Sequence, residues 1–260
     1  MSTVVYLGLG DDLTVVGGVI VAVFGAGALR GYGGFGFALA AVPLLTTFWP
    51  PMLAIPVVLI LEIVLTIAFL PALWASIDRR SVALLITGAA IATPMGQWAM
   101  LAVPASSLRL AIGLLLLAFV ALLWAPPTGR RRASPVWTLG AGAASGLLNG
   151  GTAMSGPPIV LYYLGHQVSA ETSRASMMAY FLLSAAVAIT VGEATHVYAA
   201  DFGLYALKLA PFALAGSFVG GRCFAAFPVT AYRRAVLVVL AILGFYTLAG
   251  EGFGFHFMEK

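Results

Sequence analysis

Apolar residues run through this sequence in ten segments, which charged or Pro/Gly-rich stretches separate. A membrane-spanning helix needs about 20 predominantly apolar residues, and most of the segments approach that length. We therefore predict an all-α polytopic membrane protein. The predicted helices are 13–29, 33–48, 51–74, 82–102 and 107–124 in the first half, and 136–149, 155–165, 174–193, 203–224 and 232–250 in the second half.

The two sets of five segments repeat each other. Gly27 and Arg30 align with Gly146 and Asn149 at a constant offset of 119. The order of short and long segments is also the same in both halves, which favours duplication over chance similarity between Gly-rich apolar stretches. At an offset of 124, Gly96, Ala102, Pro104, Arg109 and Ala111 align with Gly220, Ala226, Pro228, Arg233 and Ala235.

The positions of the basic residues orient these halves. Arg79 and Arg80 follow the third segment, and 130–132 is a run of arginines, so both loops are expected in the cytoplasm. The loop 193–201, which is equivalent to the Arg79 loop, is acidic and is expected outside. Equivalent loops then lie on opposite sides, an inverted-topology repeat, with both termini outside. The predicted units are an N-terminal repeat 1–129, a basic cytoplasmic linker 130–135 and a C-terminal repeat 136–260.

Composition agrees with a membrane protein. Hydrophobic residues make up 62% of the chain, charged residues 8%, and the mean hydropathy is +1.04. An ordinary soluble domain has about 25% charged residues, so the composition excludes a cytosolic enzyme, a disordered chain and a nucleic-acid-binding domain. The single cysteine, Cys223, excludes an internal disulfide and a cysteine-ligated metal cluster. We expect no cofactor and no metal.

The first two segments of each half are short and flank a glycine-rich stretch, so each pair is predicted to form a broken-helix hairpin beside three long helices. In an inverted repeat the two breaks meet near the bilayer midplane, where half-helix N-termini bind anions. Packing between helices is the alternative role for these glycines. The candidate substrate-binding residues are Arg30, Gly31, Tyr32, Gly33, Gly34, Gln97, Asn149, Gly150, Gly151, Thr152, Ser155 and Gly156.

Three polar residues within predicted spans each have two possible roles or a position that explains them. Glu62 is in the middle of the third segment, where it either carries a coupling proton or pairs with an arginine. Gln97 either contacts substrate or forms an interhelical hydrogen bond. Lys208, near the start of its segment, is expected to extend its charge to the membrane surface.

Four stretches together resemble the TauE/SafE sulfite exporter family, also called the toluene sulfonate uptake permease family, over essentially the whole chain. The resemblance implies a transporter, and not an enzyme, in the bacterial inner membrane. It also implies export of small sulfur-containing anions, sulfite or short organosulfonates such as sulfoacetate, by alternating access. The stretches are GALRGYGGFGFALAAVPLL and GLLNGGTAMSGPPIVLYYL, which hold the glycines, and the pair GQWAMLAVPASSLRLAIGLLL and GGRCFAAFPVTAYRRAVLVVL.

Other functions remain open on the sequence. Proton- or cation-coupled uptake of organosulfonates or other small organic anions is the alternative direction of transport. A second alternative is an intramembrane enzyme that uses Asp11 or Ser155, although such an enzyme would lack a well-placed base. A third is a structural subunit, in which the glycines would serve only for helix packing. The expected partners are a small anionic sulfur compound and the lipid bilayer, without nucleic acid. The sequence does not indicate an oligomeric state.

Overall fold

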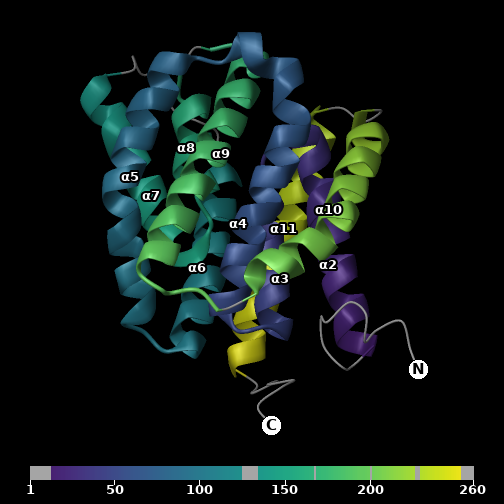
Figure 1. Cartoon of the computed structure of the whole chain (residues 1–260). Coiled ribbons are helices and arrows are strands. Elements are labelled where there is room, and N and C mark those ends of the chain that lie inside the picture. The colour runs from purple at the N-terminus through teal and green to yellow at the C-terminus, as the bar shows by residue number, and fades with distance from the viewer. Residues whose placement is uncertain (1–12, 125–133, 167, 200, 226–228, 253–260) are drawn as a thin grey trace.

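The computed structural model of the chain describes residues 13–124, 134–166, 168–199, 201–225 and 229–252. Ten α-helices and one 3-10 helix account for all the regular structure in these ranges (Figure 1). Asp11 and the arginines of the predicted linker lie outside them. The helices are α2 Leu13–Gly33, α3 Phe37–Phe48, α4 Pro51–Phe69, η1 Leu70–Ser76, α5 Arg79–Leu101, α6 Ala105–Trp124, α7 Pro135–Thr152, α8 Gly156–Leu164, α9 Ala170–Ala194, α10 Phe202–Ala225 and α11 Val229–Gly252.

Local sequence signals fix where several helices begin. The side chains of Asp78, Ser134 and Ser169 each accept a hydrogen bond from a backbone N–H in the first turn of α5, α7 and α9. Pro135 is also the first residue of its helix, where no N–H is needed. Each predicted segment corresponds to one helix. The prediction ran the third segment to residue 74, but α4 ends at Phe69 and a 3-10 turn containing Pro71 follows, because proline lacks the N–H that an α-helix requires.

The chain is a multi-pass integral membrane protein. By length and hydropathy, six helices of the described residues are able to cross a membrane. In contrast, α3 with 12 residues and α8 with 9 are each about 18 Å long or less, so neither crosses a bilayer alone. The six spans are Leu13–Gly31, Pro51–Ser76, Arg79–Leu101, Ala105–Trp124, Ala170–Ala194 and Phe202–Cys223.

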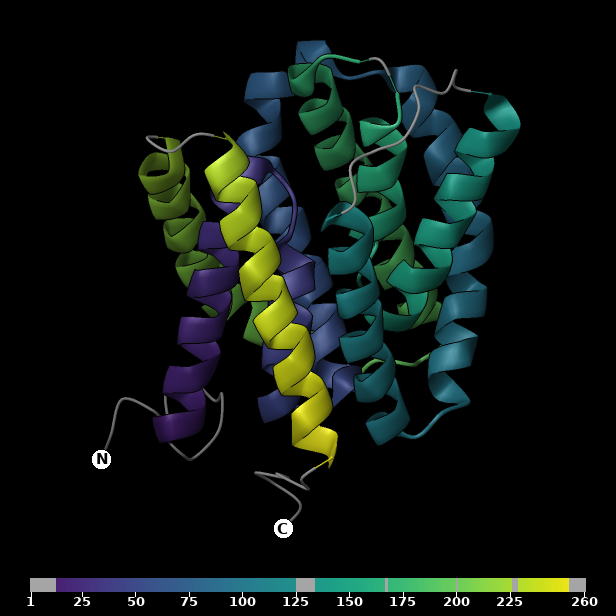
Figure 2. The same ribbon diagram turned by 180° about the vertical axis from the view of Figure 1, so that it is seen from behind.

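Helices at equivalent positions of the two halves run in opposite directions. In Figures 1 and 2, α2, α4 and α6 run from the end that holds the start of α2 towards the opposite end, whereas α7, α9 and α11 run back. The connection between α4 and α5 and the C-terminal end of α10 lie together at that opposite end. These two places carry Arg79 and Arg222, so both basic residues lie at the same end of the helices.

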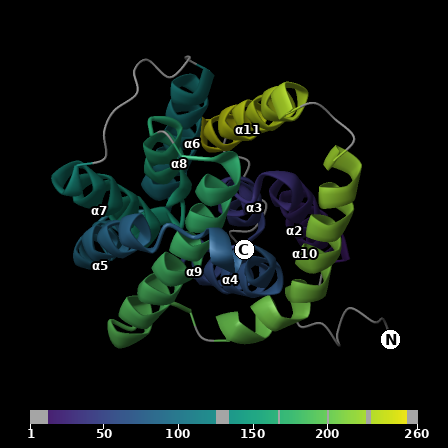
Figure 3. The same ribbon diagram turned by 90° about the horizontal axis from the view of Figure 1, so that it is seen from above.

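The two halves interlock and do not form separate bundles. The most extensive packing joins α2 to α10 and α5 to α7, so that the first helix of each half lies against the fourth helix of the other (Figure 3). The contacts α4 with α10 and α5 with α9 have the same reciprocal relation, and α6 packs on α11. The core between these pairs is apolar and buried, with residues such as Phe37, Leu61 and Ala213 fully enclosed.

Glycines permit the close crossings of α2 with α10 and of α5 with α7, and the contacts involve equivalent positions of the two halves. A Cβ added to Gly31 would overlap the carbonyl oxygen of Ser217 on α10, and one added to Gly150 would overlap that of Thr93 on α5. Thr93 and Ser217 are themselves equivalent at the offset of 124. The duplication that the sequence suggests therefore recurs in the packing of backbone on backbone. Further glycines at these crossings are Gly27 and Gly220 in one, and Gly96 and Gly146 in the other.

Candidate functional site

Each half contains one break between its first helix and its short second helix. Residues 34–36 separate α2 from α3, and 153–155 separate α7 from α8. Gly34 and Gly36 have φ values of 73° and 98°, which glycine adopts without strain, and Ala153 has a φ of 56°. The chain turns back into the protein at each break, so α3 and α8 begin at mid-depth (Figure 2). Gly-rich hairpins were predicted at these two places.

The N-termini of α3 and α8 lie at the same small buried cavity. No hydrogen bond from a side chain caps either N-terminus among the described residues, so the first N–H groups are left for another partner. An N-terminus carries partial positive charge, and two that converge favour an anion between them. The cavity volume is about 20 Å³, room for about one water molecule, and its lining residues are Gly36, Ala38, Leu39, Val58, Leu59, Glu62, Asn149, Ala153, Ser155, Gly156, Phe181 and Ala185.

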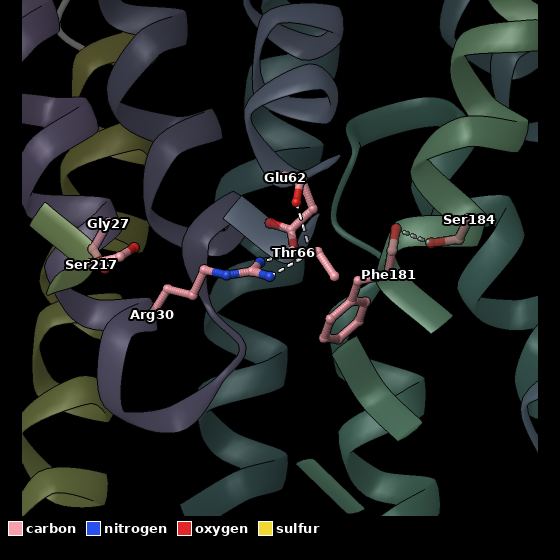
Figure 4. Close-up of polar contacts among 7 residues, drawn as sticks. All are labelled: Gly27, Arg30, Glu62, Thr66, Phe181, Ser184 and Ser217. Carbon is pink, nitrogen blue, oxygen red and sulfur yellow. Dashed lines mark hydrogen bonds and ion pairs between the residues drawn. The ribbon is translucent and has the colours of Figure 1, made fainter. Parts of the chain in front are cut away.

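Arg30 and Glu62 form a buried ion pair beside this cavity. Arg30, in the last turn of α2, is 2% exposed, and its Nη1 donates to the Glu62 carboxylate on α4. Its Nη2 donates to the Thr66 hydroxyl at 2.5 Å (Figure 4). Thr66 in turn donates to the backbone carbonyl of Glu62 at 2.7 Å. Of the two roles open for Glu62 in the sequence, pairing with an arginine is thus observed, and the coupling role stays a prediction.

Asn149 occupies the equivalent place in the second half. Its Nδ2 donates to the backbone carbonyl of Ser184 on α9 at 2.8 Å. In both halves, therefore, the polar residue of the first helix binds the third helix of its own half. Ser155 lies at the start of α8, and its carbonyl accepts a hydrogen bond from Ser145 at 2.5 Å. Asn149, Ser155 and Glu62 all line the cavity, so the structure brings these predicted residues together.

Several other predicted residues make contacts within the protein. Gly31 and Gly150 face the partner helices at the close crossings, and Gly151 packs near Gly96. Thr152 donates to Leu148 in its own helix and accepts from the backbone N–H of Met154. Gly156 lines the cavity. Tyr32 and Gly33 close α2, and Gly34 follows them with its N–H bonded to the Arg30 carbonyl; the side chain of Tyr32 is outside the described part of the chain. A substrate contact at these positions stays a prediction.

Gln97 lies in a different environment, on α5. Its Nε2 donates to the carbonyl of Ala188 at 2.7 Å and to the hydroxyl of Tyr198 at 2.9 Å. Tyr198 belongs to the loop between α9 and α10, and burial raises the pKa of its hydroxyl, which therefore stays protonated. The interhelical hydrogen bond weighed for Gln97 is present, and Gln97 also links Tyr198 to α5.

Sequence reasoning missed Thr66 and Arg174. Thr66 lies one helical turn after Glu62, on the same face of α4, and this spacing is a signal that the sequence contains. Arg174, on α9, lies with its side chain against Gly34 and its Nη2 3.5 Å from the Gly31 carbonyl at the end of α2. A cation at the C-terminus of a helix is favourable, but nothing in the sequence relates α9 to that end of α2. The described residues contain no group of three His, Cys, Asp or Glu placed to hold a metal.

Comparison with known families adds to this geometry. A family model described as "Sulfite exporter TauE/SafE" matches residues 19–247. The chain belongs to the TauE/SafE sulfite exporter family. Its members are membrane transporters of sulfite-type anions, and the resemblance noted in the sequence is confirmed. No curated protein and no solved structure matches the chain. In this TauE/SafE chain, the converging N-termini and the buried Arg30 provide positive charge of the kind such an anion requires.

Proposed function

We propose that this protein moves small sulfur-containing anions, sulfite or short organosulfonates such as sulfoacetate, across the bacterial inner membrane, with export as the net direction. One observation carries the proposal. The N-termini of the two half-helices α3 and α8, one from each half, meet at a buried cavity that Glu62, Asn149 and Ser155 line. A sulfonate or sulfite group presents several acceptor oxygens, which suit backbone N–H groups from two directions together with the Arg30 fork.

Alternating access is the proposed mechanism, with the halves acting as an inverted-topology repeat. Reciprocal contacts support it, since α2 with α10 and α5 with α7 form two glycine-tight pairs that each contain one helix from either half. The cavity lies between elements of both halves. Rocking of one rigid pair against the other would expose the cavity to opposite sides in turn. Arg79 at the start of α5 and Arg222 near the end of α10 support a cytoplasmic location for that end, with both termini outside.

Energetics bear on the direction. With a negative interior, outward movement of one uncoupled negative charge is favoured by about 2.3 kcal/mol per 100 mV. Export of a monoanion therefore needs no further energy source. The second candidate is uptake of organosulfonates coupled to protons or cations, which the mid-span carboxylate Glu62 favours because such a group is able to carry a proton.

The test begins with ligand binding by the purified protein. Ligands that bind only the folded state raise stability by RT ln(1 + [L]/Kd), so a thermal-shift panel of sulfite, sulfate, sulfoacetate, taurine and acetate should select the sulfur oxyanions. Flux of the selected anion into liposomes that contain the protein then tests transport. Binding without flux would support a structural role, and neither binding nor flux for any of these anions would overturn the proposed substrate class.

A further inference from the structure

Both terminal nitrogens of Arg30 donate a hydrogen bond to a protein oxygen. Nη1 binds Glu62 and Nη2 binds Thr66, and the side chain is 2% exposed. A bidentate oxyanion would use the same kind of fork. Each terminal nitrogen carries a second N–H, so an oxyanion that used this fork would lie directly beside the Glu62 carboxylate and the Thr66 hydroxyl.

The two partners of Arg30 differ in how strongly they would resist displacement. Thr66 is neutral. Its hydroxyl donates a hydrogen bond to the backbone carbonyl of Glu62 and accepts one from Arg30. Glu62 carries a full negative charge when ionised, so it alone opposes an anion electrostatically as well as by occupying a nitrogen.

The carboxylate also has access to the cavity. Glu62 lines the cavity together with Phe181, and Figure 4 shows the Arg30 guanidinium reaching Glu62 and Thr66 from the α2 side, with Phe181 on the other side of Thr66. An anion that enters the cavity therefore meets Glu62 next to the cation that it needs.

We propose that Glu62 and the transported anion compete for Arg30, and that one proton binds Glu62 whenever one anion binds. This inference rests on the proposed function and names its coupling ion. An empty site holds Arg30 and an ionised Glu62, with no net charge. A loaded site holds Arg30, a protonated Glu62 and a monoanion, again with no net charge. Binding an anion without the proton would leave an extra buried charge, which is strongly unfavourable.

Other ionisable groups near α4 do not replace Arg30 in this role. The helix α3 contains no ionisable residue. Arg174, on α9, has its Nη2 near the Gly31 carbonyl, so its interactions are with the end of α2. The remaining ionisable residues on the helices packed against α4 are Glu171, Tyr180 and Glu193 on α9, Tyr205, Lys208, Arg222 and Cys223 on α10, and Arg109 on α6.

The coupling has a consequence for direction. Movement of one monoanion together with one proton transfers no net charge, so the flux follows the combined gradients of anion and proton. The membrane potential then has no direct effect on the rate. Net export then requires the outward anion gradient to exceed the inward proton gradient, and net uptake results otherwise. The contribution of the membrane potential given above for an uncoupled anion does not apply to this coupled movement.

Binding to the wild-type protein gives the first test. Methanesulfonate and sulfoacetate are the probes, because a sulfonate stays ionised across the pH range of the experiment whereas sulfite itself titrates. The expected result is that Kd rises by about tenfold per pH unit wherever anion binding takes up one proton, with about one proton taken up per anion bound in weakly buffered solution. A Kd independent of pH, without proton uptake, would overturn the inference.

Transport by matched variants gives the second test. In proteoliposomes with a clamped potential, wild-type flux should not respond to the potential. Glu62→Gln removes the same charge that protonation removes. This variant should therefore bind anions at every pH without taking up a proton, and its flux should respond to the potential. Glu193→Gln, the same chemical change at an exposed position of α9, should behave like the wild type.

The outcomes separate the two proposals. Sulfonate transport with a pH-independent Kd and equal voltage responses in wild type, Glu62→Gln and Glu193→Gln would overturn the coupling and leave the transport function standing. Absence of binding and flux in the wild type for every sulfur anion at every pH would overturn the proposed function itself. Should Glu62→Gln fail to fold, proton uptake by the wild-type protein decides the question.

Discussion

The break between α2 and α3 is held by a charged pair, whereas the break between α7 and α8 is held by neutral hydrogen bonds. Arg30 binds Glu62 in the first case, and Asn149 binds the Ser184 carbonyl in the second. The backbone plan is shared, since each break leads into a half-helix whose uncapped N-terminus faces one cavity. The two halves thus share the geometry of the break, and the titratable pair lies in the first half.

The largest difference between the two breaks is expected when the charge of Arg30 is removed. In Arg30→Ala, Glu62 is left buried without its cation, which in general costs about 3–5 kcal/mol, less whatever protonation of the carboxyl recovers. Anion binding and flux should be lost. Asn149→Ala removes one neutral hydrogen bond and should cost about 0.6–1.7 kcal/mol, with weakened but measurable transport.

Thermal unfolding in detergent and flux in liposomes measure these two effects. Lys208→Ala, which removes a cation of α10 that does not line the cavity, is the control and should keep transport near the wild-type rate. Equal, unimpaired flux in Arg30→Ala and Lys208→Ala would remove Arg30 from the site.

The glycine crossings should respond alike in both halves. In Gly31→Ala and Gly150→Ala the new methyl group would overlap a backbone carbonyl of the facing helix, so each variant should lose about 1–3 kcal/mol or more. Gly25→Ala in α2 and Gly140→Ala in α7 meet no atom within 4 Å and should be neutral or stabilised by up to about 1 kcal/mol. Unfolding temperatures of the four variants provide the measurement. Intact stability in Gly31→Ala alone would mean that the two crossings are not equivalent.

The smallest expected difference lies at the equivalent residues Ser217 and Thr93. Ser217 donates across the crossing to the Gly27 carbonyl at 3.0 Å, whereas Thr93 donates within its own helix to Ala89 at 2.8 Å. Ser217→Ala should therefore cost about 0.6 kcal/mol of stability between helices. Thr93→Ser retains its hydroxyl and should cost less. A larger loss in Thr93→Ser, measured in the same unfolding experiment, would contradict this assignment.

Much of the fold follows from local properties of the sequence. The apolar segments gave the helices, because their length matches a bilayer and a helix satisfies its own backbone groups. The glycines near residues 34 and 151 gave the places of the two breaks. The alignment of Gly27 with Gly146 gave the repeat, which recurs in equivalent packing contacts. The sequence also predicted candidate site residues that line the cavity, including Asn149 and Ser155.

The sequence alone determined which residues are apolar, which are polar within a span, and where the helices stop, since each of these depends on neighbours along the chain. Only the tertiary structure decided that Arg30 pairs with Glu62 and Thr66, and that Gly31 and Gly150 contact helices of the opposite half. These partners are separated by 32 residues or more. Their meeting depends on the rotation and crossing of whole helices, which are set by close packing across the interlocked halves and by no local pattern.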